Sequence, residues 1–133
     1  MLQAIYLSTA RPELEAGAID DILAQSRRNN HADGITGLLL YDGYHFLQAL
    51  EGDPARVRHA IDRIKADPRH RAMVVLCWRE VDEPSFGGKS MAAQRVPIGN
   101  GGTVAYLVDS LTEEVDPIVR SIFRDVARYR IAA

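Results

Sequence analysis

The chain alternates between short apolar runs typical of strands and longer segments in which apolar residues recur at helical spacing. Residues 2–8 form a compact apolar run that predicts a first strand. A loop at 9–14 contains Pro12. After it, apolar residues, continued by two small polar ones, are spaced at i, i+3, i+4, i+7 and i+11, and this spacing predicts an amphipathic helix. The positions in that stripe are Ile19, Ile22, Leu23, Ser26 and Asn30. Asp33-Gly34 then supplies a glycine where a left-handed helix end requires one.

Two further apolar runs, 35–41 and 44–51, are separated by Asp42-Gly43. An Asp-Gly pair between apolar runs is the strongest short-range signal for a β-hairpin. The second of these strands alternates, so Phe46, Gln48 and Leu50 share one face.

The second half of the chain repeats the helix–strand pattern. Asp53-Pro54 predicts a helix start, and an apolar stripe continues to the stop at Asp67-Pro68. Residues 73–81 predict a buried strand, and 90–98 predict a short final strand. Residues 99–102 are a glycine-rich break, and an apolar stripe beyond Asp109 predicts a last amphipathic helix.

The predicted order is β-α-β-β-α-β-β followed by a C-terminal helix. That order defines an α+β, ferredoxin-like sandwich: a five-stranded mixed sheet with two helices on one face. We expect the compact domain to span 1–98. We expect the extension, 99–133, either to cover the open sheet face or to form an interface with a partner or another copy.

Composition narrows the class of protein. The 133 residues suit one domain, and 47% hydrophobic with 26% charged residues is ordinary for a globular chain. A net charge of −2 disfavours direct nucleic-acid binding. No apolar run is long enough to span a bilayer and the N-terminus does not resemble a signal peptide, so we expect a cytoplasmic protein.

Three polar positions interrupt apolar faces. Gln48 shares a strand face with Phe46 and Leu50, Asn29 and Asn30 close the first helix, and Tyr6 lies on the face of the first strand. Each has an ordinary structural explanation: backbone pairing for glutamine, helix capping for asparagine and packing for tyrosine. Together they can face one space between the sheet and its helices. Amides and a phenol around an apolar slot suit a flat heteroaromatic ligand.

Arg69 and His70 follow the second helix, either as a solvated loop with cations near a helix C-terminus or as a cation pair at a pocket mouth for phosphate or ribityl groups. The four histidines and Cys77 have no metal-ligand spacing, so we expect no metal site. Cys77 lies in an apolar run and is expected to be an inert core residue.

Several of these segments occur in the order found in BLUF domains, the blue-light sensors that use FAD. The segments are Ile5-Tyr6-Leu7-Ser8, Asn29-Asn30, Gly34–Tyr41, Phe46–Gly52 and Asp67-Pro68-Arg69-His70. The resemblance covers about residues 2–97. The chain therefore resembles a short BLUF protein, and the fold of that family agrees with the order predicted from pattern.

The resemblance implies a flavin, FAD with FMN or riboflavin as alternatives, held between the two helices. Asn30 matches the asparagine that binds the ring edge, and Asn29 matches a polar position near the ring. Gln48 and Tyr6 match the glutamine and tyrosine of the photochemistry. Arg69 and His70 match positions beside the ribityl and phosphate end. The implied mechanism is electron and proton transfer from tyrosine to excited flavin, followed by rotation or tautomerisation of the glutamine amide.

Met91 matches the family's last-strand methionine, whereas Lys89 stands where a tryptophan is usual. No enzymatic output domain is recognisable after residue 98, so the resemblance implies no catalysed reaction, a separate signalling protein as partner and a homo-oligomer. Two alternatives stay open: a flavin-free interaction scaffold of the same fold, and a small ferredoxin-like enzyme, either a flavin oxidoreductase or an acylphosphatase-like hydrolase.

Overall fold

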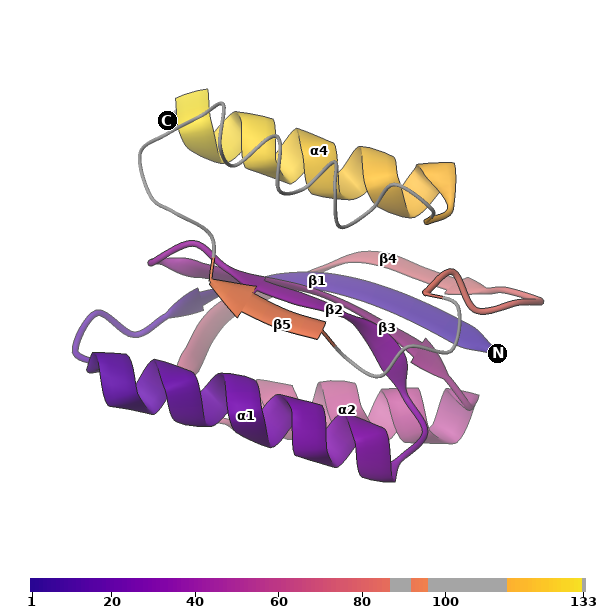
Figure 1. The fold of residues 1–133 in the computed structure, drawn as a ribbon, viewed down its shortest axis with the longest axis horizontal. Coiled ribbons are helices and arrows are strands. Elements are labelled where there is room, and N and C mark those ends of the chain that lie inside the picture. Colours follow the sequence, from indigo (N-terminus) through magenta and orange to yellow (C-terminus); the bar gives the residue numbers. More distant parts are fainter. Residues whose placement is uncertain (87–91, 96–114, 133) are drawn as a thin grey trace.

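The protein is described by a computed structural model covering residues 1–86, 92–95 and 115–132. Five strands form one mixed sheet in the order β4-β1-β3-β2-β5 (Figure 1). Neighbouring strands are antiparallel except for the parallel pair β2–β5. The strands are β1 (Leu2–Ala10), β2 (Thr36–Tyr41), β3 (His45–Gly52), β4 (His70–Glu80) and β5 (Ala92–Arg95).

Helices α1 (Ala16–Ala32) and α2 (Pro54–Ala66) cover one face of the sheet, and α4 (Pro117–Ala132) lies over the other (Figure 1). The ferredoxin-like α+β class, the order of elements and the five-stranded sheet are thereby confirmed. The predicted glycine break at 99–102 lies outside the described residues, as do Lys89 and Met91.

Local signals in the sequence set the ends of these elements. Gly34 adopts φ +68° just after α1, and the Asp42-Gly43 turn joins β2 to β3 with Gly43 at φ +98°. Both conformations are costly for residues that carry a Cβ. The Asp53 carboxylate accepts a hydrogen bond from the Arg56 backbone N–H at 3.3 Å, and Pro54 occupies the first position of α2.

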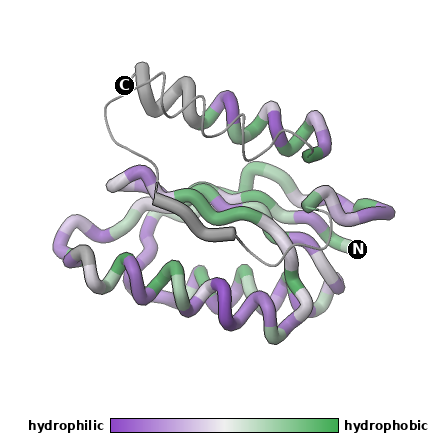
Figure 2. Tube along the Cα trace, in the orientation of Figure 1, coloured by the Kyte–Doolittle hydropathy of each residue, from purple (hydrophilic) through white to green (hydrophobic). Residues whose placement is uncertain are grey.

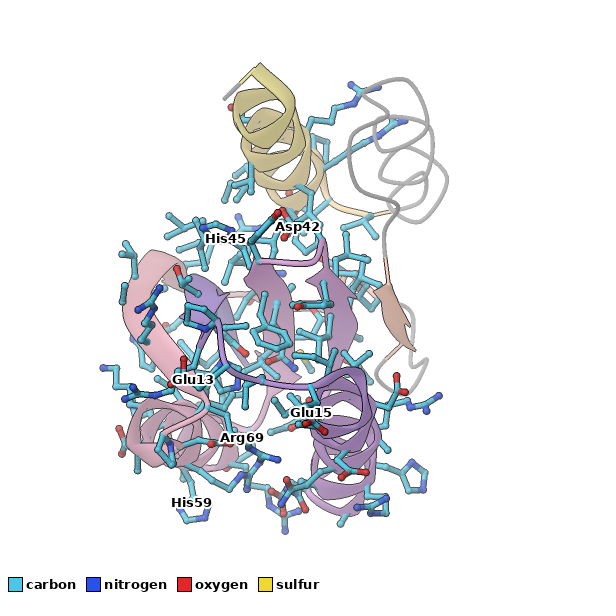
Figure 3. All side chains as sticks on the ribbon, turned by 90° about the vertical axis from the view of Figure 1, so that its left-hand side faces the viewer. Glu13, Glu15, Asp42, His45, His59 and Arg69 are labelled. Carbon is cyan, nitrogen blue, oxygen red and sulfur yellow. The ribbon has the colours of Figure 1, made fainter. Side chains whose placement is uncertain are left out.

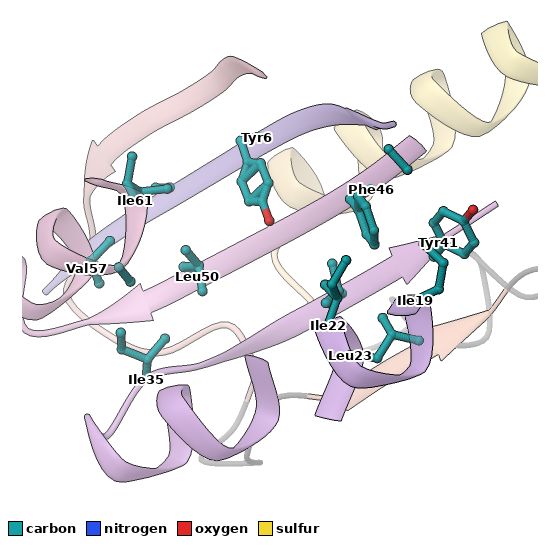
Figure 4. Packing of buried hydrophobic residues seen from close by; sticks show 14 of the residues in the cluster. Tyr6, Ile19, Ile22, Leu23, Ile35, Tyr41, Phe46, Leu50, Val57 and Ile61 are labelled. Carbon is teal, nitrogen blue, oxygen red and sulfur yellow. The ribbon is translucent and has the colours of Figure 1, made fainter. Parts of the chain in front are cut away.

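The alternation of β1 and β3 divides the apolar residues into two cores. Figure 2 shows hydrophobic residues along the central strands and on the sheet-facing sides of the helices. Tyr6, Phe46 and Leu50 pack toward α1 and α2 (Figure 4), whereas Ile5 and Ala49 pack toward α4. Each strand therefore contributes to both faces, and the candidate polar residues of β1 and β3 lie on the α1/α2 side.

The expectation of a buried strand at 73–81 is wrong. Strand β4 pairs only with β1 at one edge of the sheet, and Val74, Leu76 and Trp78 are 54%, 40% and 44% exposed. Cys77, expected in the core, is only partly buried beside the α4-side cluster. An apolar run does not distinguish an edge strand from a central one. The strand also begins at His70 rather than residue 73, which places His70 opposite Ala10.

Apolar contacts hold helix α4 to the sheet, and an ion pair links the residue before the helix to β4. Val119 and Phe123 are fully buried in the cluster that includes Ile5. Arg79 of β4 forms an ion pair with Asp116, just before the helix, at 3.3 Å. Within the described ranges, no helix has the length and apolar character to cross a membrane.

Candidate functional site

A pocket opens between α1 and α2 above the middle of the sheet. Its cavity volume is about 60 Å³, and the whole opening, including space open to solvent, measures about 460 Å³. Ile22, Leu39 and Ile64 supply apolar walls from three different elements. The polar lining consists of Tyr6, Gln25, Ser26, Asn29, Asn30, Gln48, Arg63, Asp67, Arg69 and His70.

At the floor of the pocket, Tyr6 and Gln48 face each other across paired strands. The Tyr6 hydroxyl donates to Gln48 Oε1 at 2.5 Å, and both side chains are about 1% exposed. Burial raises the pKa of the Tyr6 phenol well above its usual range, and the charge of Asp67 adds to this shift. The phenol therefore keeps its proton in the resting protein and acts as the donor.

The Gln48 amide is held from its other end by a serine of α1. Gln48 Nε2 donates to Ser26 Oγ at 3.1 Å, so the amide oxygen faces β1 and the amide nitrogen faces the helix. Asn30, one helical turn further along α1, also donates from Nδ2 to Ser26 Oγ at 3.1 Å. One hydroxyl thus links the helix asparagine to the strand glutamine.

Asn30 carries an unsatisfied acceptor. The side chain is 1% exposed, and its Oδ1 has no hydrogen-bond partner. Leaving a buried amide oxygen unpaired costs about 1–3 kcal/mol. A ligand N–H placed in the pocket beside Asn30 would satisfy this oxygen.

The mouth of the pocket carries a positive charge held in position by a carboxylate. The Arg69 side chain lies between α1 and α2, while His59 points outward from α2 (Figure 3). Arg69 Nη2 lies 2.7 Å from Asp67 Oδ2 and donates to Gln25 Oε1 at 2.8 Å. Burial alone would raise the pKa of the Asp67 carboxyl, but hydrogen bonds and charge from Arg69 outweigh it and lower that pKa.

His70 lies at the inner end of this mouth. Its Nδ1 and Ser8 Oγ share a hydrogen bond of 2.8 Å, and its ring centroid is 4.6 Å from that of Phe46. Burial lowers the pKa of the His70 imidazole below its ordinary 6.5; the charge of Asp67 opposes that shift and the charge of Arg69 adds to it. His70 is therefore a neutral ring at neutral pH.

Six of the residues singled out from the sequence line this one pocket: Tyr6, Asn29, Asn30, Gln48, Arg69 and His70. Met91 lies outside the described residues. Ser26 was not predicted as a site residue, although a hydroxyl in an apolar helical stripe, four positions before Asn30, was the available signal. In the described part of the chain, no three or more His, Cys, Asp or Glu side chains cluster as metal ligands.

The pocket combines apolar walls, an unpaired amide oxygen, a second amide and a cation at its opening. This chemistry fits a flat heteroaromatic ring with hydrogen-bonding edges and an anionic tail. An isoalloxazine ring edge presents carbonyl oxygens and a ring N–H, which complement the asparagine amide. The fold and the pocket thus define an α+β domain with a pocket whose lining suits a flavin ring.

Comparison with known proteins identifies the family. The model of "BLUF: Sensors of blue-light using FAD" matches residues 1–92. The chain belongs to this family, and its sensor class is that of flavin-dependent blue-light receptors. The match supports the sensor over the scaffold and enzyme alternatives.

Several relatives carry the same domain. The blue light- and temperature-regulated antirepressor BluF of Escherichia coli is 33% identical over 87 residues, which are 65% of this chain and 22% of the relative. Among solved structures, BlrP1 of Klebsiella pneumoniae with FMN and cyclic diGMP is 27% identical with a TM-score of 0.74, covering 99% of this chain and 35% of that one. The dark-state structure of the BLUF protein BlrB is 27% identical with a TM-score of 0.72, covering 96% of each chain.

Proposed function

We propose that this protein is a blue-light photoreceptor that binds a flavin non-covalently in the pocket between α1 and α2. The family match gives the class of cofactor, and the unpaired Asn30 Oδ1 in the α1 lining of the pocket carries the assignment of the site. FAD is the expected flavin, with FMN and riboflavin as alternatives. The pocket would contact the isoalloxazine ring, which all three flavins share.

Five lining residues have roles in holding the flavin in this proposal. The Asn30 amide binds the carbonyl and ring-nitrogen edge of the flavin, and Asn29 adds a polar contact near the ring. Arg69 and His70 lie beside the ribityl and phosphate end. Asp67 supports this function by holding the Arg69 guanidinium at the mouth through hydrogen bonds of 2.7–3.1 Å.

A bound flavin would supply a light-excited electron acceptor, and Tyr6 would supply the electron and the proton. The residues define the proton's first step: the Tyr6 hydroxyl points at Gln48 Oε1, so the proton leaves the phenol toward the amide oxygen. A phenol whose pKa is raised by burial does not ionise in the dark. Proton release therefore waits for the electron to leave.

Rearrangement of the Gln48 amide follows, by rotation or by tautomerisation. In the resting arrangement Oε1 accepts from Tyr6 and Nε2 donates to Ser26. Rotation exchanges these two ends, so that the amide nitrogen faces the tyrosine oxygen and the amide oxygen can accept from the Ser26 hydroxyl. Ser26 supports either state, because a hydroxyl both donates and accepts. The rebuilt hydrogen bonds would shift the flavin absorption slightly to the red.

In this proposal the signal passes through the last strand, with Met91, and through α4 to a separate signalling protein. The receptor forms a homo-oligomer in the cytoplasm. It does not catalyse a reaction itself. The lengths of the relatives are consistent with a sensor domain that signals to different partners: the chain spans about a fifth of the E. coli antirepressor and about a third of BlrP1. The same domain thus occurs within much longer proteins.

Flavin retention tests the proposed site. Protein stripped of any flavin is mixed separately with FAD, FMN and riboflavin, passed through gel filtration, and examined for visible absorption in the protein peak. We expect at least one flavin to remain bound at equal stoichiometry. A protein peak free of all three flavins would contradict the proposal.

A further inference from the structure

A row of polar side chains crosses the sheet on the face opposite the pocket. Arg79, Gln3, Glu51 and Thr36 occupy successive registered positions on β4, β1, β3 and β2. We call this set the Glu51 ladder. Gln3 and Glu51 are fully buried, and the photochemical assignments above use neither of them.

The Glu51 carboxylate collects four hydrogen bonds. The backbone N–H groups of Ser85 and Phe86 donate at 2.9 and 2.7 Å. The Gln3 amide and the Thr36 hydroxyl each donate at 3.2 Å. All four partners are uncharged donors, and the buried oxygens of this side chain stay satisfied only while each donor stays in place. The ladder therefore fixes residues 85–86, which precede β5, to the end of β3.

The same ladder reaches α4. Gln3 Oε1 accepts a hydrogen bond from Arg79 Nε at 2.8 Å, and Arg79 Nη2 pairs with Asp116. Asp116 also accepts from the Ile118 backbone N–H at 2.8 Å and so caps the start of the helix. The chain of contacts from Glu51 to the helix start is continuous.

We propose that Glu51 is the positioning residue that couples β3 to both the segment leading to β5 and the start of α4. Glu51 lies three residues from Gln48 on the same strand, with its side chain on the opposite face of the sheet. A displacement of β3 that accompanies rearrangement of Gln48 moves the carboxylate. Its donors follow because leaving buried polar atoms without hydrogen bonds is costly. The light-driven step of this inference rests on the proposed function. The hydrogen bonds that Glu51 makes in the dark do not depend on it.

Amide hydrogen exchange tests the Glu51 ladder in Glu51→Gln, with Glu80→Gln on the exposed end of β4 as the matched control. The amide of the variant offers only one acceptor oxygen to two backbone N–H donors. We expect exchange of residues 117–126 about tenfold faster in the dark, the factor that one lost hydrogen bond supplies. In the flavin-loaded protein, the light-minus-dark difference in those residues is lost while the flavin red shift is kept. Wild-type exchange and light response of α4 in Glu51→Gln, or the same losses in Glu80→Gln, would overturn the proposal.

A second variant covers the case in which Glu51→Gln fails to fold. Arg79→Met keeps the aliphatic stem and removes only the outer link. Residues 117–126 should then exchange faster while the amides of Ser85 and Phe86 stay protected; unchanged exchange of α4 would overturn the coupling. If the wild-type protein showed no light-induced red shift, the photoreceptor function would be contradicted. The dark-state exchange experiment would still test the Glu51 ladder.

Discussion

Tyr6 and Gln48 occupy opposite positions on β1 and β3, and the tyrosine hydroxyl donates to the glutamine amide oxygen at 2.5 Å. Antiparallel pairing brings side chains that are forty-two positions apart in sequence onto the same face. Both side chains are about 1% exposed, which limits competition from water for the hydrogen bond. Hydrogen bonds with Tyr6 and Ser26 hold the two ends of this amide in opposite directions.

Replacing Gln48 with leucine should leave flavin bound and abolish the light-induced red shift. Leucine fills a similar volume but offers no hydrogen-bonding end that can exchange between Tyr6 and Ser26. Absorption spectra before and after blue light measure the effect. Gln25→Leu at the rim of the pocket is the matched control and should shift normally; a normal shift in Gln48→Leu would defeat the amide mechanism.

Removing the Tyr6 hydroxyl should stop the photochemistry while leaving the fold intact. In Tyr6→Phe, Gln48 Oε1 loses the hydrogen bond from the Tyr6 hydroxyl in a buried site, so we expect the free energy of unfolding to fall by about 1–3 kcal/mol. Denaturant unfolding and light-minus-dark spectra check the two effects. Tyr44→Phe, at a residue 59% exposed, should change neither. A full red shift in Tyr6→Phe would contradict the assigned role.

Asn30→Ala should weaken flavin binding by about 10- to 100-fold, because an amide that contacts the ring edge contributes roughly 1–3 kcal/mol. A titration of flavin-free protein followed by flavin fluorescence gives the dissociation constant. Asn29→Ala, at a half-buried neighbour, should lose less affinity. An unchanged dissociation constant for Asn30→Ala would remove this residue from the site.

The lowered pKa of His70 makes stability depend on pH. Below the ordinary value of 6.5, the unfolded chain binds a proton that the buried ring resists, so the free energy of unfolding falls as the pH falls through this window. Unfolding at pH values above and below 6.5 should show a smaller decrease for His70→Gln than for wild type. His59→Gln, on the exposed side of α2, serves as control. Equal pH slopes in wild type and His70→Gln would contradict this account.

The packing of α4 depends on Phe123, which is fully buried against the sheet. Phe123→Ala should lower the free energy of unfolding by about 3–5 kcal/mol through lost burial and the remaining cavity. Ile118→Ala, on the same helix at a residue 51% exposed, should change it by less than about 0.5 kcal/mol. Equal effects of the two substitutions in denaturant unfolding would show that α4 does not pack as described.

The sequence predicted what local signals encode. Helix stripes, the Asp42-Gly43 turn and strand alternation were sufficient for the order of elements and for the face on which Gln48 lies. The exposure of β4 was missed because strand order is set by long-range pairing that an apolar run does not reveal. The Glu51 ladder was missed for a related reason: its residues meet only through the register of four strands. The boundary predicted at residue 98 stays a prediction, since 96–114 lie outside the described residues.

The central claim is that this pocket holds a flavin whose hydrogen bonds rearrange in light. The most direct measurement is the visible absorption spectrum of the purified, flavin-loaded protein, recorded in darkness, just after blue light and again during dark recovery. The account predicts a flavin spectrum that shifts slightly to the red and relaxes in the dark. A bound flavin whose spectrum does not shift, or a protein that binds no flavin at all, would contradict it.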